Sequence, residues 1–454
     1  MVQSIPDTVE SRLLLPPRIT MFVLCANSPR PAGHAWLKSD PQELLGRAFC
    51  VVILACCLCL PARPALAEHT LVFGMSAAFS GPARGLGMEY QRGILAAFSH
   101  INTHGGASGW RLVLSLRDDG YGPTAALNNT IAFVEQERVF ALLGYVGTPT
   151  TTRVLPLLKH YESSDMALLF PLTGSDMLRE RSYDDCVFNL RGSYIDETRT
   201  LVGAFLKSGR KRIAVFHQAD VYGRNGWDGV RRALASHRLS IVSEATYGRG
   251  AHFAQDFRRE VGLVLLGNPD AIVTVGTAPA CAAFVRDLRA AGYGNIVAAL
   301  SFADSDNMAK YLRAQSRVTG RDYLSGVVFS QVVPCYEDER LPAVRLYKRA
   351  MAHSCPPMPP QLAPEEYSPQ PLSFVSFEGF LVGLALGEAV KRMGDAPTRE
   401  KLRHVFGHLG AVDLGLGEKV DLRPGAGQGL RRTYLTVYKN GHFQGVEHLR
   451  TVQP

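Results

Sequence analysis

Short apolar segments alternate with longer amphipathic segments along most of this chain, and this alternation constrains the fold more than any other feature. Strands are predicted at Leu71–Met75, Leu112–Leu114, Phe140–Gly144, Ala167–Phe170, Ile213–Phe216, Ile241–Ser243, Ala271–Val275 and Ile296–Leu300. Helices are predicted at Met88–Ile101, Thr124–Glu137, Thr151–Tyr161, Leu201–Leu206, Trp227–His237, Phe257–Leu266 and Ala282–Ala291. Such alternation gives βαβ units, so we predict an α/β fold with parallel sheets covered by helices on both faces.

The N-terminal residues 1–67 have a different character and are predicted to lie outside this fold. Ala48–Leu60 contains no charged residue, Arg47 precedes it, and the small-residue pattern Ala65–Ala67 follows. This apolar run is too short to cross ~30 Å of hydrocarbon as a helix, and it is typical of a signal peptide. We therefore expect an N-terminal extension and signal peptide over residues 1–67, cleaved before Glu68.

Three alternatives stay open for this segment. It could remain as an uncleaved anchor, or the protein could be a lipoprotein with Cys56 in a degraded lipobox. The Pro-rich residues 1–46 are also consistent with a later start at Met21.

The cysteines give no metal-binding pattern. Five of the nine precede residue 68, which leaves Cys186, Cys281, Cys335 and Cys355. No two of these four are closer than twenty residues, which argues against a zinc site. In an oxidising compartment, a Cys335–Cys355 disulfide and four free buried thiols are both consistent with the spacing.

Composition and motifs exclude several classes of function. The net charge of +8 is spread over the whole length without a Lys/Arg block, so we expect a solvated basic surface and no nucleic-acid partner. The chain contains no GxSxG, GxxxxGK[ST] or HExxH motif. We therefore predict that the protein is not an enzyme and has no catalytic residues, no metal and no cofactor.

Polar loops follow several predicted strands, which is where ligands bind in open α/β sheets. Residues 144–151 and 171–176 are dense in Gly, Thr and Ser, and both segments have the composition of a helix start. Free backbone N–H groups and hydroxyls at a helix start favour an anion such as a carboxylate. The alternative is ordinary helix capping by Thr150, Ser175 and Asp176.

Three further features have a functional and a structural interpretation. Asp118–Asp119 could act as an acid/base or ligand pair, but adjacent side chains diverge, so we favour a capping or solvated role. His217 is interpreted as a structural histidine. Tyr222 follows a predicted strand and could offer a ring face and a hydroxyl to a small ligand, with plain packing as the alternative.

Several ordered motifs resemble the leucine/isoleucine/valine-binding proteins, the type I periplasmic solute-binding components of ABC transporters. The motifs are FGMSAAFSGPARGLGMEYQRGILAAFSHINTHGG, WRLVLSLRDDGYGPTAALNNTIAFVEQE, ALLGYVGTPTTTRVLPLL, RIAVFHQADVYGRNGWDGVRRAL, DAIVTVGTAPACAAFVRDLRAAG and SFVSFEGFLVGLALGEAV. Together they span roughly residues 70–440. The resemblance implies two Rossmann-like lobes with parallel sheets, joined by a three-strand hinge and closing on a ligand.

The resemblance also implies how the chain is divided. The first lobe is expected over residues 68–190 plus 332–412, and the second over residues 191–331 plus 413–454. The chain should cross between the lobes near Leu190–Tyr194, Gln331–Pro334 and Ala411–Leu414.

Ligand contacts carried over from the family fall on both lobes. In the first lobe they are Thr148, Leu172, Thr173, Gly174 and Leu86, and in the second they are Tyr222, Thr277 and Phe302. The family's acidic residue, which holds an α-ammonium, should fall near Ser301–Ala303, where this sequence has Phe302 and the first acid is Asp304. An unpaired ammonium in a closed cleft would cost several kcal/mol. Either Asp304 supplies the charge from a shifted loop, or the ligand has no ammonium.

The resemblance implies a function in transport. We expect a monomeric protein that is secreted to the periplasm and captures a small carboxylate ligand, either a branched-chain amino acid or a related organic or aromatic acid. Its partner would be an ABC permease in the inner membrane. The alternative is a sensory or regulatory ligand-binding protein of the same fold, without a permease.

Overall fold

The computed structural model describes residues 69–353, 367–423 and 428–452, together with Pro357, Pro359 and Leu362. All of them belong to one unit of the chain, Ala67–Pro454. The signal peptide predicted over residues 1–67 and the cysteine Cys355 lie outside the described residues. Within the described ranges, no helix is long and apolar enough to cross a bilayer.

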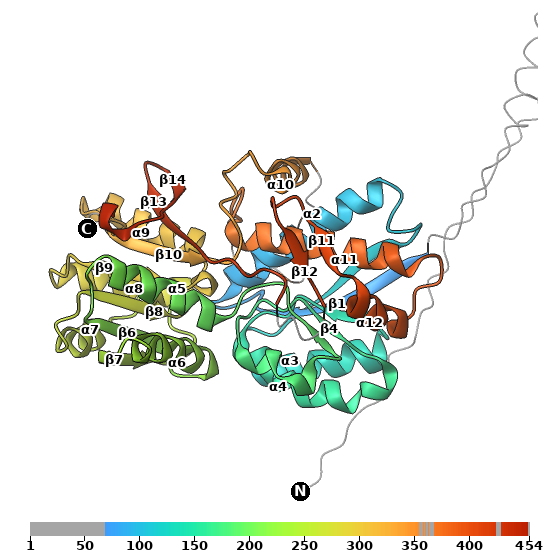
Figure 1. Cartoon of the computed structure of the whole chain (residues 1–454), viewed down its shortest axis with the longest axis horizontal. Coiled ribbons are helices and arrows are strands. Elements are labelled where there is room, and N and C mark those ends of the chain that lie inside the picture. Colours follow the sequence, from blue (N-terminus) through green and yellow to red (C-terminus); the bar gives the residue numbers. More distant parts are fainter. Residues whose placement is uncertain are drawn as a thin grey trace, which may run out of the picture. The chain divides into compact units, whose positions relative to one another are not determined.

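The first sheet is parallel throughout and has the strand order β2-β1-β3-β4-β5. Its strands are β1 (Thr70–Ala77), β2 (Arg111–Asp118), β3 (Ala141–Leu143), β4 (Leu168–Leu169) and β5 (Val187–Phe188). Its helices are α2 (Arg84–Thr103), α3 (Pro123–Ile131), α4 (Thr148–His160), α11 (Phe374–Met393) and α12 (Arg399–His408). Helices α2 and α11 pack together on one face, and α3 and α4 pack together on the other (Figure 1). We call this sheet with its helices the first lobe.

The second sheet has the order β14-β13-β10-β9-β8-β6-β7. Its strands are β6 (Ile213–Gln218), β7 (Ile241–Tyr247), β8 (Ala271–Val275), β9 (Ile296–Ala299), β10 (Val327–Gln331), β13 (Tyr434–Lys439) and β14 (His442–Gly445). Its helices are α5 (Tyr194–Lys207), α6 (Val221–Ala235), α7 (Arg258–Leu265), α8 (Ala278–Ala290) and α9 (Ser305–Thr319). We call this sheet with its helices the second lobe (Figure 1).

The predicted alternation of strands and helices is confirmed. Every strand and helix predicted from the sequence is present, with ends that differ by several residues for α5 and by fewer for most others. One addition is the antiparallel hairpin β13–β14, which pairs with β10 at the edge of the second sheet. Its turn is Asn440–Gly441, where both residues have positive φ, as a two-residue hairpin turn requires.

Three segments connect the lobes and lie beside one another. Gly192 of the first segment lies against Val332 of the second and Leu430 of the third. The Leu430 amide also donates to the Leu190 carbonyl at 2.6 Å. The third segment therefore meets the first near residues 428–430, downstream of the crossing expected at 411–414.

Residues near that expected crossing form a small hairpin instead. Strand β11 (Ala411–Asp413) pairs with β12 (Lys419–Asp421), and the Gly415 carbonyl between them accepts from the Ala343 amide at the start of α10 (Pro342–His353). Helix α10 packs on α2 and α11 of the first lobe. Residue spacing alone does not reveal this hairpin, because its position depends on contacts with α10.

Candidate interlobe ligand site

We call the surface where the two lobes are in contact the seam. Four aromatic rings, contributed by both lobes, lie together at this seam. Tyr222 (α6) and Phe302, just after β9, have ring centroids 4.7 Å apart, and Tyr194 at the start of α5 lies 5.1 Å from Tyr222. From the first lobe, the ring of Tyr121 reaches 6.2 Å from Phe302. All four side chains are buried. A molecule from solvent would therefore reach these rings only when the lobes separate.

A pair of hydroxyls lies beside these rings. The Oγ1 atoms of Thr148 and Thr173 are 2.8 Å apart, and both residues are completely buried. The Tyr194 hydroxyl lies 3.5 Å from Thr173 Oγ1, so Tyr194 links the hydroxyl pair to the aromatic rings. Thr148 is the first residue of α4, whose free N–H groups favour a negatively charged ligand. We call Tyr121, Thr148, Thr173, Tyr194, Tyr222 and Phe302 the interlobe site.

Gly147 leaves room in the first lobe for the Tyr121 ring at the interlobe site. Its φ of 103° is in the region that favours glycine, and a Cβ here would lie 2.3 Å from the Tyr121 ring. A larger residue would therefore displace Tyr121 from the seam.

Three other predicted ligand contacts, Gly174, Leu172 and Thr277, lie at different places relative to the interlobe site. Gly174 packs on Tyr194, whose amide donates to the Gly174 carbonyl at 2.9 Å. Leu172 is buried and bridges to Val146 in the backbone, so it supports the loop that carries Thr148. Thr277 precedes α8, and its amide donates to the Tyr247 hydroxyl. The Tyr222 hydroxyl donates to the carbonyl of Gly276, the residue before Thr277, at 3.5 Å.

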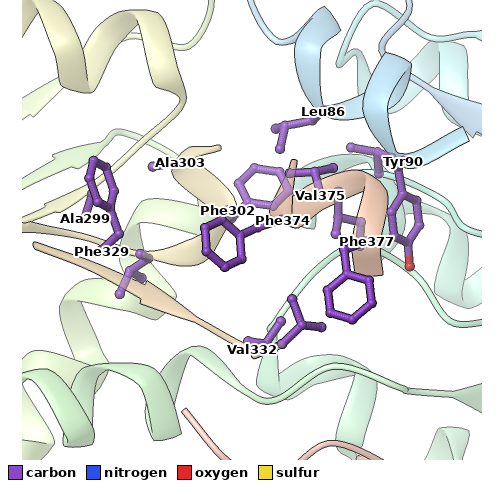
Figure 2. Close-up of a cluster of buried hydrophobic side chains, with 14 of the residues drawn as sticks. Leu86, Tyr90, Ala299, Phe302, Ala303, Phe329, Val332, Phe374, Val375 and Phe377 are labelled. Carbon is purple, nitrogen blue, oxygen red and sulfur yellow. The ribbon is translucent and has the colours of Figure 1, made fainter. Parts of the chain in front are cut away.

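Leu86 contributes to an apolar cluster that also crosses the seam. Figure 2 shows this cluster, drawn from both lobes and the second connecting segment. Its labelled residues are Leu86, Tyr90, Ala299, Phe302, Ala303, Phe329, Val332, Phe374, Val375 and Phe377. Phe302 belongs both to this cluster and to the interlobe site, so apolar surface adjoins the hydroxyl pair.

The polar atoms of the site are neutral. Burial raises the pKa of Tyr121, Tyr194 and Tyr222 above the ordinary value, so each phenol keeps its proton. The Tyr121 hydroxyl makes no hydrogen bond of good geometry, although Gln218 lies close enough to influence its pKa. The buried Ser175 hydroxyl likewise has no hydrogen-bond partner among the described residues. The hydroxyls of Thr148, Thr173 and Tyr194 are therefore neutral donors, and the buried Arg191 guanidinium lies close enough to Tyr194 to oppose the rise in its pKa.

A buried ionic group lies at the first connecting segment. The guanidinium of Arg191 lies 3.5 Å from Glu378 of α11 and 3.9 Å from Glu197 of α5, and it donates to Ser301. The Glu197 carboxylate also accepts from the Ser301 amide at 2.9 Å. Burial raises the pKa of Glu378 to about 7, with Arg191 opposing and Glu197 adding to the rise. This group joins an element of each lobe to the connecting segment.

Asp304, the nearest acid to the position expected for an ammonium partner, is engaged elsewhere. It is buried, its Oδ1 caps the Asn307 amide and its Oδ2 accepts from the Asn307 side chain at 2.6 Å. No hydrogen bond or ion pair in the described chain joins Asp304 to the interlobe site. The structure also agrees with the capping role favoured above for Asp118–Asp119 and with the structural role favoured for His217.

Asp118 accepts from the Phe79 and Gly120 amides and so holds the loop after β1, and Asp119 accepts from Ser76 at 2.7 Å. His217 bonds the Gln218 carbonyl at 3.1 Å. All three side chains therefore serve local structure.

The sequence analysis missed Tyr121, Tyr194 and Arg191. Tyr121 lies between Gly120 and Gly122, so the sequence indicated only a turn at this position. In the structure Tyr121 has a left-handed φ of 64°, which is uncommon for a bulky residue. Tyr194 and Arg191 fall in the predicted crossing near Leu190–Tyr194. That position indicated a connection but not a contact with the ligand site.

Two α/β lobes joined by three connecting segments, with buried aromatic and hydroxyl groups between them, define a two-lobed ligand-binding protein. The sequence model of the periplasmic binding protein family matches residues 70–442. The chain therefore belongs to the periplasmic binding protein family, which consists of solute-binding proteins rather than enzymes. The predicted resemblance and fold class are confirmed.

Individual relatives agree with this assignment. The chain is similar to the crystal structure of a possible leucine/isoleucine/valine-binding protein from Rhodopirellula baltica, with 30% identity, a TM-score of 0.74 and coverage of 85% of this chain and 98% of that one. An amino acid binding protein of Pseudomonas aeruginosa is 25% identical over 232 residues, which are 50% of this chain and 60% of that protein. The match thus spans less than two thirds of the Pseudomonas protein.

A more distant structure has the same fold. It is a fatty acid ABC transporter substrate-binding protein from Thermomonospora curvata, with 18% identity, a TM-score of 0.68 and coverage of 85% of this chain and 93% of that one.

Proposed function

We propose that this protein is exported to the periplasm by a cleaved signal peptide, binds a small carboxylate ligand between its lobes as a monomer, and delivers it to an ABC permease. The observation that carries the proposal is the buried Thr148–Thr173 hydroxyl pair at the start of α4, next to the rings of Tyr194 and Tyr222. Neutral donors at a helix start suit a carboxylate, and aromatic rings suit an apolar body.

The proposed ligand class is a carboxylic acid whose apolar body needs no ammonium partner. Phe302 occupies the position at which the family resemblance places an acid, and the Asp304 carboxylate already accepts from Asn307. A branched-chain amino acid would place an ammonium against aromatic rings and hydroxyls. Burying that charge without a partner costs several kcal/mol. The names of the Pseudomonas and Thermomonospora proteins show that amino acids and fatty acids are both bound on this fold, so the choice depends on side chains.

The proposal is tested by thermal unfolding in the presence of aliphatic and aromatic carboxylic acids. A ligand at 100 times its Kd should stabilise the folded protein by about 2.7 kcal/mol and raise Tm measurably. If no carboxylic or amino acid raises Tm, the proposal is wrong.

A variant locates the binding site. Thr173→Val should weaken binding of the identified acid by roughly 10- to 100-fold, because it removes one hydrogen bond to a charged group. The matched control is Thr152→Val, since Thr152 lies one turn along α4 and its hydroxyl donates to the Thr148 carbonyl. Equal affinities of the two variants would contradict the assigned site.

A further inference from the structure

Three buried carboxylates that the interlobe site does not use face one another across the seam. Glu89 lies on α2 of the first lobe, and Asp304 and Asp306 lie at the start of α9 in the second. All three side chains are buried. Gly85, in the first turn of α2, lies directly against Asp304 and Asn307, so the two helix starts are in contact. We call Glu89, Asp304 and Asp306 the carboxylate cluster.

A continuous chain of hydrogen bonds links Asp304 to Glu89. Asn307 donates to Asp304 at 2.6 Å and contacts the Tyr367 hydroxyl at 3.2 Å. The Tyr367 hydroxyl in turn donates to Glu89 at 3.0 Å. Gln370 runs parallel to this chain: its amide donates to Glu89 at 2.8 Å, and its side chain donates to Asn307 at 3.1 Å. Residues of both lobes are therefore held by one polar network.

Asp306 makes a second connection. It accepts from the Tyr336 hydroxyl at 2.7 Å and from the Phe374 amide at the start of α11 at 2.9 Å. Tyr336 follows the second connecting segment, and Phe374 belongs to the first lobe. Both oxygens of this second-lobe carboxylate thus bond to groups outside the second lobe.

The charges around the cluster are unbalanced. Arg92 pairs with Glu89 at 2.7 Å, and the Lys310 ammonium donates to the Ser368 carbonyl across the seam. The titratable and charged groups that face the cluster are Arg84 and Arg92 on α2, Lys310 and Tyr311 on α9, Tyr336 after β10, Tyr347 on α10, and Tyr367 before α11. Within the described ranges the ion pair to the cluster is the one between Arg92 and Glu89, and burial raises the pKa of Glu89 in spite of it.

Burial therefore favours the protonated carboxyls. Burial, with a smaller contribution from Glu89, raises the pKa of Asp304 to about 7, although the hydrogen bond from the Asn307 side chain opposes the rise. Burial also raises the pKa of Asp306 and of Glu89. An exposed Asp has a pKa of about 3.9, so separated lobes release the proton that contacting lobes hold. The pKa is higher when the lobes are in contact, so lobe contact is strongest at low pH, weakens as pH rises from the pKa of separated lobes through 7, and levels off above that.

We propose that the carboxylate cluster is a proton-dependent latch between the lobes, so that closure takes up a proton and retention of the ligand weakens as pH rises to neutrality. This regulation rests on the proposed function, because it acts on the site that the lobes enclose. Ligand contact and lobe contact then depend on different groups.

The first test follows the lobes without a ligand. Small-angle X-ray scattering of the purified protein should give a larger radius of gyration at pH 8.5 than at pH 5.5. Asp304→Asn and Glu89→Gln each remove a carboxylate from one lobe and should reduce this difference. The control Asp256→Asn removes an exposed acid of the second lobe that pairs with Arg258, and it should behave as wild type. A radius of gyration that is the same at both pH values in wild type overturns the proposal, whatever the variants do.

The second test separates the latch from the proposed function. The affinity for 4-methylpentanoate, measured by calorimetry, should fall about tenfold between pH 6 and pH 8 in wild type, as one proton with a closed-state pKa near 7 dictates. In Asp304→Asn the fall should be at least threefold smaller. A pH-independent affinity in wild type overturns the latch and leaves the proposed function standing. Absence of binding, together with the scattering change, contradicts the ligand class and supports the latch.

Discussion

The interlobe site and the carboxylate cluster both span the seam, and both are buried, but they use opposite chemistry. At the interlobe site, the groups that cross are neutral phenols, hydroxyls and a phenyl ring. At the carboxylate cluster they are acids whose pKa values are raised by burial. Because the tyrosines keep their protons throughout the physiological range, the first region has a fixed character. The second changes charge near neutrality. The comparison predicts that recognition and closure have separable pH dependences.

The largest expected effect comes from Arg191, the buried cation at the first connecting segment. Arg191→Leu leaves Glu197 and Glu378 buried beside each other without their cation, and it should lower the free energy of unfolding by about 3–5 kcal/mol. The loss should be smaller at pH 6 than at pH 8, because burial raises the pKa of Glu378 to about 7 and a protonated carboxyl needs no cation.

Urea unfolding at the two pH values measures this loss. The control is Arg199→Leu on α5, whose largely exposed ion pair with Asp196 should contribute at most about 1 kcal/mol. A loss below 1 kcal/mol for Arg191→Leu at pH 8 would contradict the role of this ionic group as a support between the regions.

An intermediate effect is expected where backbone shape holds the aromatic rings. Gly147→Ala should cost about 1–3 kcal/mol, because it strains a positive φ and drives a methyl group into the Tyr121 ring. Gly209→Ala is the matched control: it also has positive φ, but no atom lies within 4 Å of the added Cβ. If thermal unfolding gives equal losses for both variants, the contact with Tyr121 carries no weight.

The smallest effect should come from the Tyr121 hydroxyl. Tyr121→Phe keeps the ring and removes a buried hydroxyl that lacks a well-formed hydrogen bond, so the free energy of unfolding should stay within about 0.5 kcal/mol or rise. Tyr90→Phe removes a hydroxyl that donates to the Phe170 carbonyl at 2.9 Å, and it should cost about 1 kcal/mol. A greater loss for Tyr121→Phe than for Tyr90→Phe in urea unfolding would show that the hydroxyl has a partner.

The sequence predicted the strands and helices of the fold better than it predicted the contacts between them. Strand–helix alternation defined β1 through β9 apart from the very short β5, because a buried parallel strand needs a short apolar run. It did not indicate β13 and β14, although Asn440–Gly441 is a recognisable hairpin turn, because these two strands are antiparallel and lie outside the βαβ alternation. The hinge position depended on how residues 428–430 meet Leu190, which no local pattern encodes.

The site was predicted in part for the same reason. Loop position and family resemblance pointed to Thr148, Thr173, Tyr222 and Phe302, and the structure places these four residues around Tyr194. Their role in binding stays a prediction. Glu89 and Asp304 are separated by more than two hundred residues, and the hydrogen bonds that link them run through Asn307 and Tyr367, which residue order does not bring together. Burial of three acids at one seam could not be read from residue order.

The most direct test of the central claim compares an amino acid with its deaminated analogue at the interlobe site. Calorimetry at pH 6 should use leucine against 4-methylpentanoate and phenylalanine against 3-phenylpropanoate. We predict that in at least one pair the acid without an ammonium binds as tightly as the amino acid or more tightly, and that Asp304→Asn leaves the ratio of the two affinities unchanged. A preference of tenfold or more for the amino acid, lost in Asp304→Asn, would contradict the account, because Asp304 would then be the ammonium partner.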